Sequence, residues 1–233
     1  MPGTIVDMHV HTTLGASDSE LEPDDLARIA AGIGLTGVTV TEHDRVWERH
    51  QAERFRDRHA PLFMYAAMEV STELGHILAY GLPSYVTGIR RAARLREEID
   101  AVGGYLVAAH PFRHWFDPVT FRRAGKEPPE MNAVALSRLP IFELVDAVEA
   151  LNGANTEREN RFALEVATCL GKPATAGSDA HSTSGIGIYA TVFEQELESG
   201  EQLLAELRAG HFYPALGLPD GRLRRFSADA TSD

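Results

Sequence analysis

Asp7-Met8-His9-Val10-His11 closes an apolar, β-branched run that begins at Thr4. Such a run predicts a β-strand. Because side chains alternate along a strand, Asp7, His9 and His11 are expected to point to the same side. Two imidazoles separated by one residue can reach one ion, and imidazole with carboxylate suits Zn, Mn or Fe. The stretch therefore indicates a candidate metal site at the end of a strand.

Similar polar groups end four other apolar runs. They lie at Thr41-Glu42-His43-Asp44, at Glu69, at His110 and at Gly177-Ser178-Asp179-Ala180-His181. Each group alone is more often a structural feature than a ligand set. Five such groups in one domain instead favour a ligand set. Buried polar groups without partners cost several kcal/mol each, and a bound ion removes that cost. We therefore expect a multinuclear metal site in a metal-dependent hydrolase.

The rest of the chain alternates strand-like and helix-like segments. Strands are expected at 4–11, 36–41, 62–70, 75–80, 105–109, 145–151, 173–176 and 186–193, and helices at 23–33, 46–59, 89–102, 156–170 and 200–209. This alternation predicts βα units and a mostly parallel sheet. In a (β/α) barrel, residues that follow the strands gather at the C-terminal face, where active sites are built.

The segment 112–139 has little periodicity and contains three prolines and several basic residues. A connection of this length without regular structure is usually functional or mobile. Two interpretations stay open: a lid over an anionic substrate, or a plain surface excursion, which we favour.

Composition narrows the classes of function. The chain has 233 residues, a formal net charge of −12 and 44% hydrophobic residues. The negative charge argues against nucleic-acid or anionic-membrane partners. We expect no transmembrane helix, no secretory signal and a cytoplasmic location, because no long apolar run or basic leader is present. The single cysteine, Cys169, is interpreted as a small buried hydrophobic residue.

The ordered set D-x-H-x-H, T-E-H-D, a Glu followed closely by His, A-H-P and G-S-D-A-H resembles the PHP (polymerase and histidinol phosphatase) family. The resemblance spans about residues 5–195 and includes the stretch 148–155. It implies a distorted (β/α)7 TIM-like barrel in one domain. We accordingly assign residues 1–221 to this domain and residues 222–233 to a polar C-terminal tail.

The resemblance also implies the ligands of up to three ions. His9, His11, Glu69 and Asp179 would hold the first ion. Glu69 would bridge to a second ion, held also by His76 and His110, while the third would be held by Asp18, His43 and His181. Two departures matter. The connection from His11 to Asp18 is longer than in the relatives, and the short gap from Glu69 to His76 suggests a tight hairpin.

Three further residues receive roles beside the ligands. Asp7 and Asp44 are interpreted as carboxylates that orient metal-bound imidazoles, which usually donate their second N–H to such groups. Arg113, close to His110 in the sequence, could contact a phosphate through two hydrogen bonds.

The favoured function is a phosphatase or phosphodiesterase for a small phosphorylated metabolite. Two or three divalent ions (Zn, Mn or Fe) would generate hydroxide near neutral pH, because coordination lowers the pKa of water from about 15.7 to about 7. The catalytic set would be His9, His11, Glu69, Asp179 and Arg113. The alternatives are a PHP-type 3′–5′ exonuclease or nucleotide phosphoesterase, a non-catalytic metal-binding module, and amide hydrolysis on the same ions. The oligomeric state is not predicted.

Overall fold

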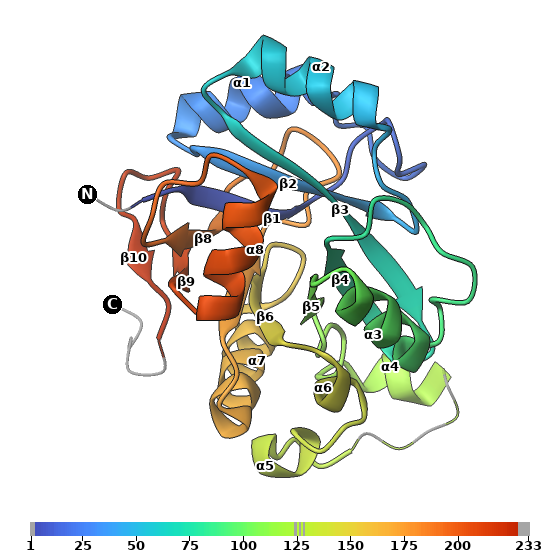
Figure 1. The fold of residues 1–233 in the computed structure, drawn as a ribbon. Coiled ribbons are helices and arrows are strands. Elements are labelled where there is room, and N and C mark those ends of the chain that lie inside the picture. The colour runs from blue at the N-terminus through green and yellow to red at the C-terminus, as the bar shows by residue number, and fades with distance from the viewer. Residues whose placement is uncertain (1–2, 124, 126, 128, 228–233) are drawn as a thin grey trace.

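The computed structural model describes residues 3–123, 125, 127 and 129–227 (Figure 1). In these residues one curled sheet runs through the molecule. Its strands are β1 (Ile5–Val10), β2 (Gly37–His43), β3 (Phe63–Thr72), β4 (Gly75–Tyr80), β5 (Tyr105–Ala108), β6 (Ala147–Asn152), β7 (Ala174–Gly177), β8 (Tyr189–Phe193), β9 (Phe212–Leu216) and β10 (Arg224–Arg225). Their spatial order is β10-β9-β8-β1-β2-β3-β4-β5-β6-β7.

Helices connect and cover these strands. They are α1 (Pro23–Ile33), α2 (Arg49–His59), α3 (Ala92–Ala101), α4 (Pro118–Arg123), α5 (Ala133–Leu136), α6 (Ile141–Leu144), α7 (Glu157–Leu170) and α8 (Gly200–Ala209). The predicted bounds of α1, β4 and α8 are confirmed. At α1, Pro23 begins the helix with its fixed φ, and Gly34 ends it at a φ of 86°.

The sheet is only partly parallel, whereas the sequence predicted a mostly parallel sheet in a distorted (β/α)7 barrel. Strands β1, β2 and β3 are parallel, as are β5, β6 and β7, but β4 is antiparallel to both β3 and β5. The cause is local. Only Glu73 and Leu74 separate β3 from β4, and so short a turn can form a hairpin but not a parallel crossover. The predicted tight hairpin is therefore confirmed.

Although β7 stands at one end of the strand order, the curl of the sheet returns it to β1. The backbone N–H of Asp179 donates to the carbonyl of His9 at 2.7 Å, and the N–H of His11 donates to the carbonyl of Ala180 at 3.1 Å. A parallel bridge joins Val10 to Ala180. The ends of the first and seventh strands are thus held together, and the metal-type side chains that follow them converge.

Apolar packing closes the opposite end of the sheet. Leu203 and Leu207 of α8 lie in one buried cluster with Val6 and Met8 of β1. That cluster also contains Tyr105 and Ala147, which begin β5 and β6. Helices α1 and α2 lie together over β1 to β3 (Figure 1) and bury Leu26 and Phe55 in a second cluster. This first cluster therefore fills the N-terminal side of β1, β5 and β6, whereas buried polar residues lie at or just after the C-terminal ends of these strands.

Several features differ from the sequence expectations. Strand β9 was not predicted, because Pro214 weakens its strand pattern. The segment 112–139 contains the short helices α4 and α5, and it anchors Phe112 and Leu136 in the core. Cys169 is exposed, not buried, because Ala163 and Val166 form the inner face of α7.

The predicted tail is described only as far as residue 227. Within it, Arg224–Arg225 pairs with β9 as strand β10, and the Phe226 side chain is buried beside Leu151 and Ala176. Residues 228–233 lie outside the described residues. Among the described helices, none combines the length and the apolar character needed to cross a membrane.

Candidate metal centre

The strand ends bring the predicted ligand residues into one cluster. Within it, the ligand atoms of three groups lie within 4.8 Å of one another: His9, His11, Glu69 and Asp179; Glu69, His76 and His110; and His11, His43 and His181. The first group is fully buried, whereas the other two each combine one buried residue with two partly exposed ones. The groups share Glu69 and His11, so they form one continuous centre.

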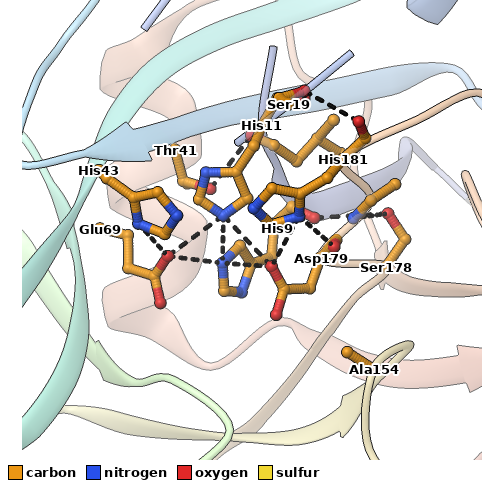
Figure 2. A network of polar contacts seen from close by, with 12 residues as sticks. His9, His11, Ser19, Thr41, His43, Glu69, Ala154, Ser178, Asp179 and His181 are labelled. Atoms are coloured by element: carbon orange, nitrogen blue, oxygen red, sulfur yellow. Dashed lines mark hydrogen bonds and ion pairs between the residues drawn. The ribbon is translucent and has the colours of Figure 1, made fainter. Parts of the chain in front are cut away.

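The first group combines two imidazoles with two carboxylates. The Nε2 atoms of His9 and His11 are 3.0 Å apart, which places both imidazoles around one point. His11 Nε2 lies 3.1 Å from Glu69 Oε2 and 3.2 Å from Asp179 Oδ1. Figure 2 shows the two carboxylates on either side of the two imidazoles. Two nitrogens and two carboxylate oxygens at these separations match a four-ligand cation site.

The second group lies at the other oxygen of Glu69. His76 Nδ1 is 2.7 Å from Glu69 Oε1, and His110 Nε2 is 2.9 Å from the same oxygen. The hairpin places His76 there, because it follows the β3–β4 turn. The predicted bridging position of Glu69 is therefore compatible with the geometry.

The third group is more open. His43 Nδ1 lies 3.1 Å from Glu69 Oε2. Asp18 Oδ2 lies 3.4 Å from His43 Nε2 and 3.5 Å from His181 Nε2, and the Asp18 side chain is 59% exposed. His181 Nδ1 is 3.0 Å from the carbonyl of Asp179, which favours a proton on Nδ1 and leaves the Nε2 lone pair free. The long connection therefore does bring Asp18 to both histidines.

The electrostatics keep the carboxylates ionised. Burial alone would raise the pKa of Glu69, but the charge of His9 and the nearby imidazoles of His11, His110 and His43 hold it well below its usual value. Burial likewise opposes ionisation of Asp179, yet the charges of His9 and Arg113 lower its pKa. The pKa of His181 is lowered, first by burial and then by His11, which favours the neutral ring that a metal requires.

One buried atom tests whether a cation fits here. Glu69 Oε2 has no hydrogen-bond partner among the described residues. The Glu69 oxygen nevertheless faces nitrogens of His9, His11 and His43 at 3.1 to 3.3 Å. A buried carboxylate oxygen without a hydrogen bond, surrounded by nitrogen ligands, is satisfied by a divalent cation. The residues present therefore fit the predicted metal ions.

The roles predicted for Asp7 and Asp44 are wrong, since within the described residues neither carboxylate contacts an imidazole. Asp7 accepts hydrogen bonds from the backbone N–H groups of Ser178 and Gly187 at 2.8 and 3.0 Å. Asp44 accepts from the Ser71 N–H at 3.1 Å and pairs with Arg90. A register irregularity in β1 between Asp7 and Val10 breaks the regular alternation that the prediction assumed. Burial raises the pKa of Asp7 to about 6.

Glu149 takes the role expected of Asp7. Its Oε1 lies 2.9 Å from His9 Nδ1, and its Oε2 accepts the His110 backbone N–H at 2.8 Å. The Asn152 side chain donates to Oε2 at 3.0 Å, and Glu149 is fully buried. One carboxylate thus fixes the His9 ring and the His110 backbone. The charged Glu149 between Val148 and Ala150 in the predicted strand 145–151 was the sequence signal for it.

Glu42 is a second residue that sequence reasoning left without a role. Its carboxylate accepts hydrogen bonds from the Thr12 N–H at 3.1 Å, from the Thr12 hydroxyl, and from Trp47 Nε1 at 2.7 Å. Gly15 packs directly on it, because a Cβ there would lie 2.4 Å from Glu42 Cγ. Buried Glu42 therefore anchors the start of the connection that carries Asp18.

Arg113 lies at the edge of the centre but faces a ligand. Its guanidinium pairs with Asp179 and donates to Asn152 Oδ1 at 2.7 Å and Asn155 Oδ1 at 3.2 Å. Its side chain is 25% exposed. The predicted phosphate contact is not tested by this arrangement, although it does place a cation beside the metal-type ligands.

Two of the clustered residues adopt the left-handed backbone region, which side-chain-bearing residues rarely use. His110 has a φ of 30° and Asp179 a φ of 54°. Such conformations cost roughly 1–3 kcal/mol each and occur mainly at functional sites. The Glu149 bond to His110 N–H and the His9 bond to Asp179 N–H hold these backbones in place.

The curled sheet and the buried cluster of His, Glu and Asp residues define an α/β protein with a candidate metal centre at the C-terminal ends of its strands. A family model described as PHP-associated matches residues 157–212. A comparison with curated proteins finds no match.

Solved structures share the fold over most of the chain. PsfC from Pseudomonas syringae PB-5123 is 19% identical with a TM-score of 0.59, covering 88% of this chain and 89% of its own. A candidate metal-dependent phosphoesterase from Bifidobacterium adolescentis is 16% identical with a TM-score of 0.59, covering 88% and 96%. An amidohydrolase from Chromobacterium violaceum is 16% identical with a TM-score of 0.55, covering 86% and 96%. The family-model match confirms the predicted resemblance over residues 157–212, and the solved structures show that the fold is shared over most of the chain.

Proposed function

We propose that the protein is a metal-dependent phosphoesterase that hydrolyses a small phosphorylated metabolite. The observation that carries the proposal is the position of Glu69, a buried carboxylate with imidazole nitrogens around both of its oxygens. The names of the structural neighbours agree with a hydrolase. One is a candidate metal-dependent phosphoesterase, and the amidohydrolase was solved with bound sulfate, an ion of similar shape to phosphate.

The proposal assigns two or three divalent ions, Zn, Mn or Fe, to nine residues. These are His9, His11, Asp18, His43, Glu69, His76, His110, Asp179 and His181. Bound ions would acidify a coordinated water and neutralise charge on a phosphoryl group. Our proposal also treats the curled sheet as a distorted (β/α)7 barrel, because β7 returns to β1 through backbone hydrogen bonds.

The protein's own residues would prepare this chemistry. Glu149 holds His9 so that its Nε2 lone pair faces the centre. Asn152 and Asn155 hold the Arg113 guanidinium near Asp179, where it can contact a phosphoryl oxygen and orient the ester. We therefore keep Arg113 in the catalytic set with His9, His11, Glu69 and Asp179.

The alternatives from the sequence stay as competing hypotheses. A PHP-type exonuclease would need a basic track for a nucleic-acid strand, whereas the chain carries a formal net charge of −12. A non-catalytic module is expected to have lost ligands, whereas all nine positions hold ligating side chains. Amide hydrolysis would use the same ions, and fold alone does not select the reaction.

The direct test is a screen of phosphorylated metabolites with protein loaded with Mn or Zn. We expect hydrolysis of at least one metabolite and of simple aryl phosphates. His9→Ala and Asp179→Ala should each remove most activity while the far-UV circular dichroism is retained, because neither side chain supports the apolar core. A His9→Ala protein with unchanged kcat would contradict the site assignment. Activity on amides alone would favour amide hydrolysis, and activity on DNA alone would favour the exonuclease.

A further inference from the structure

A cavity of about 540 Å³ adjoins the metal centre. It is formed by the β3–β4 turn, by the segment that follows β5, and by the start of α6. Its apolar lining includes Leu74, Trp115, Leu139, Pro140, Ile141 and Phe142. This volume lies in the range of about 300–1,000 Å³ that is typical of small-molecule sites.

The cavity and the metal centre share residues. His76, His110 and Arg113 line the cavity. The same two histidines contact Glu69, and the same arginine pairs with Asp179. A second cavity of about 520 Å³ between α1 and α2 is lined by Trp47 and Phe55 and by none of the nine ligand residues. Of these two cavities, only the first can therefore hold the rest of a molecule whose phosphoryl group is bound at the centre.

The aromatic part of the wall is fixed in place. The Trp115 ring makes edge contacts with Phe112 at 5.4 Å and with Phe121 at 5.9 Å between ring centroids. Phe112 is fully buried, so it holds the indole from the core side. Trp115 itself is half-buried and lines the cavity. A rigid indole offers a planar apolar surface for an aromatic group at low entropic cost.

Charges near the cavity restrict what can occupy it. Arg113 lies at the end that meets the centre, where Asp179 and two asparagines hold it. Glu73 also lines the cavity, and one of its oxygens accepts the Ala92 N–H at 2.9 Å. A second anionic group would be repelled by Glu73, and hydroxyl groups against the apolar wall would lose hydrogen bonds to water.

We propose that this cavity is the subsite for the organic group of the substrate, and that it selects phosphate monoesters of apolar, most simply aromatic, alcohols. The inference rests on the proposed phosphoesterase function, which places the phosphoryl group at the metal centre. Trp115 and Leu139 are then residues that determine specificity. The part of the segment 112–139 near each end serves as a wall of the substrate site.

The kinetic test compares benzyl phosphate with glycerol 1-phosphate, since both are esters of primary alcohols. For the zinc- or manganese-loaded protein, kcat/KM should be higher for benzyl phosphate. Trp115→Ala and Leu139→Ala should each lower the kcat/KM for benzyl phosphate about tenfold or more. The kcat/KM for glycerol 1-phosphate should change by about twofold or less. Val102→Ala removes an exposed apolar side chain outside the cavity and should change neither ester.

A binding measurement separates this inference from the reaction. The chain has two tryptophans, so NMR of the indole N–H groups, assigned with Trp115→Phe, can follow benzyl alcohol added to zinc-loaded protein. We expect the Trp115 signal to shift and the Trp47 signal to stay. If neither ester is hydrolysed but the Trp115 signal shifts, the reaction is wrong and the subsite stands. If the signal does not shift, or folded Trp115→Ala and Leu139→Ala proteins treat both esters as the wild type does, the subsite is refuted.

Discussion

The imidazole nitrogens of five histidines surround the carboxylate of Glu69. Its Oε1 faces His76 and His110, and its Oε2 faces His9, His11 and His43. A side chain with two oxygens cannot satisfy five imidazoles through hydrogen bonds of good geometry, and Oε2 makes none. Cations bound between the five imidazoles and this buried carboxylate would explain the arrangement.

At the same scale, Glu149 provides a test of how the ligands are oriented. Glu149→Gln keeps the side-chain shape but turns an NH₂ group toward the His9 ring or toward the N–H donors of His110 and Asn152. We expect metal affinity, measured by competition with a chelator, to fall about 10–100-fold. Glu165→Gln, an exposed change on α7, is the matched control. Unchanged metal affinity in Glu149→Gln would show that Glu149 does not orient the ligands.

Asp18 tests whether the third ion is independent. Its carboxylate reaches His43 and His181 from an exposed position and touches neither His9 nor Asp179 in the described contacts. Asp18→Asn should therefore lower the occupancy of one ion and leave the others, as measured by elemental analysis after dialysis. Asp25→Asn, on the exposed side of α1, should leave all occupancies unchanged. Equal loss of every ion would contradict a separate third site.

At the scale of elements, the contact between β1 and β7 places the ligands. A Cβ on Gly177 would lie 2.4 Å from His9 Cβ and 2.6 Å from His9 N, so the two strands can approach only because residue 177 is glycine. Gly177→Ala should destabilise the fold by about 1–3 kcal/mol through overpacking and should also weaken metal binding by displacing His9. Denaturant unfolding and metal titration measure the two effects.

Gly32→Ala is the control for that change. A Cβ on Gly32 would meet no atom within 4 Å, and the residue lies in helix α1. We expect it to stabilise the protein by about 0.4–1 kcal/mol with metal binding unchanged. If Gly177→Ala behaves like Gly32→Ala, the close contact of the strands does not position the centre.

The elements also show what the sequence can predict. Histidines next to strand ends are visible locally, because the apolar run and the polar residues after it are adjacent in the chain. Glu149 could not be assigned in this way, since it lies 140 residues from His9 and only the sheet brings them together. Asp7 was misassigned because a register irregularity cannot be read from alternation. The reversed direction of β4 follows from its short turn, and it prevents a regular parallel barrel.

At the scale of the whole molecule, net charge separates a small-molecule enzyme from a nuclease. A protein that binds several phosphates of a nucleic acid loses affinity about 10³–10⁵-fold between roughly 50 and 200 mM salt. A small ester held at a buried centre is screened much less. We expect kcat/KM for the best small phosphoester to change little over this range, with no processive digestion of single-stranded DNA. Robust DNA digestion without small-ester hydrolysis would favour the exonuclease.

The whole molecule is built around a histidine and carboxylate cluster that we expect to bind divalent metal ions. The most direct measurement is elemental analysis of protein prepared without chelator, together with the His9→Ala variant prepared in the same way. We expect two or three transition-metal ions per chain in the wild type and a clear loss in the variant, with both proteins folded. A folded wild-type protein that holds no metal, takes none up on titration with Zn or Mn, and still hydrolyses its substrate would contradict this expectation.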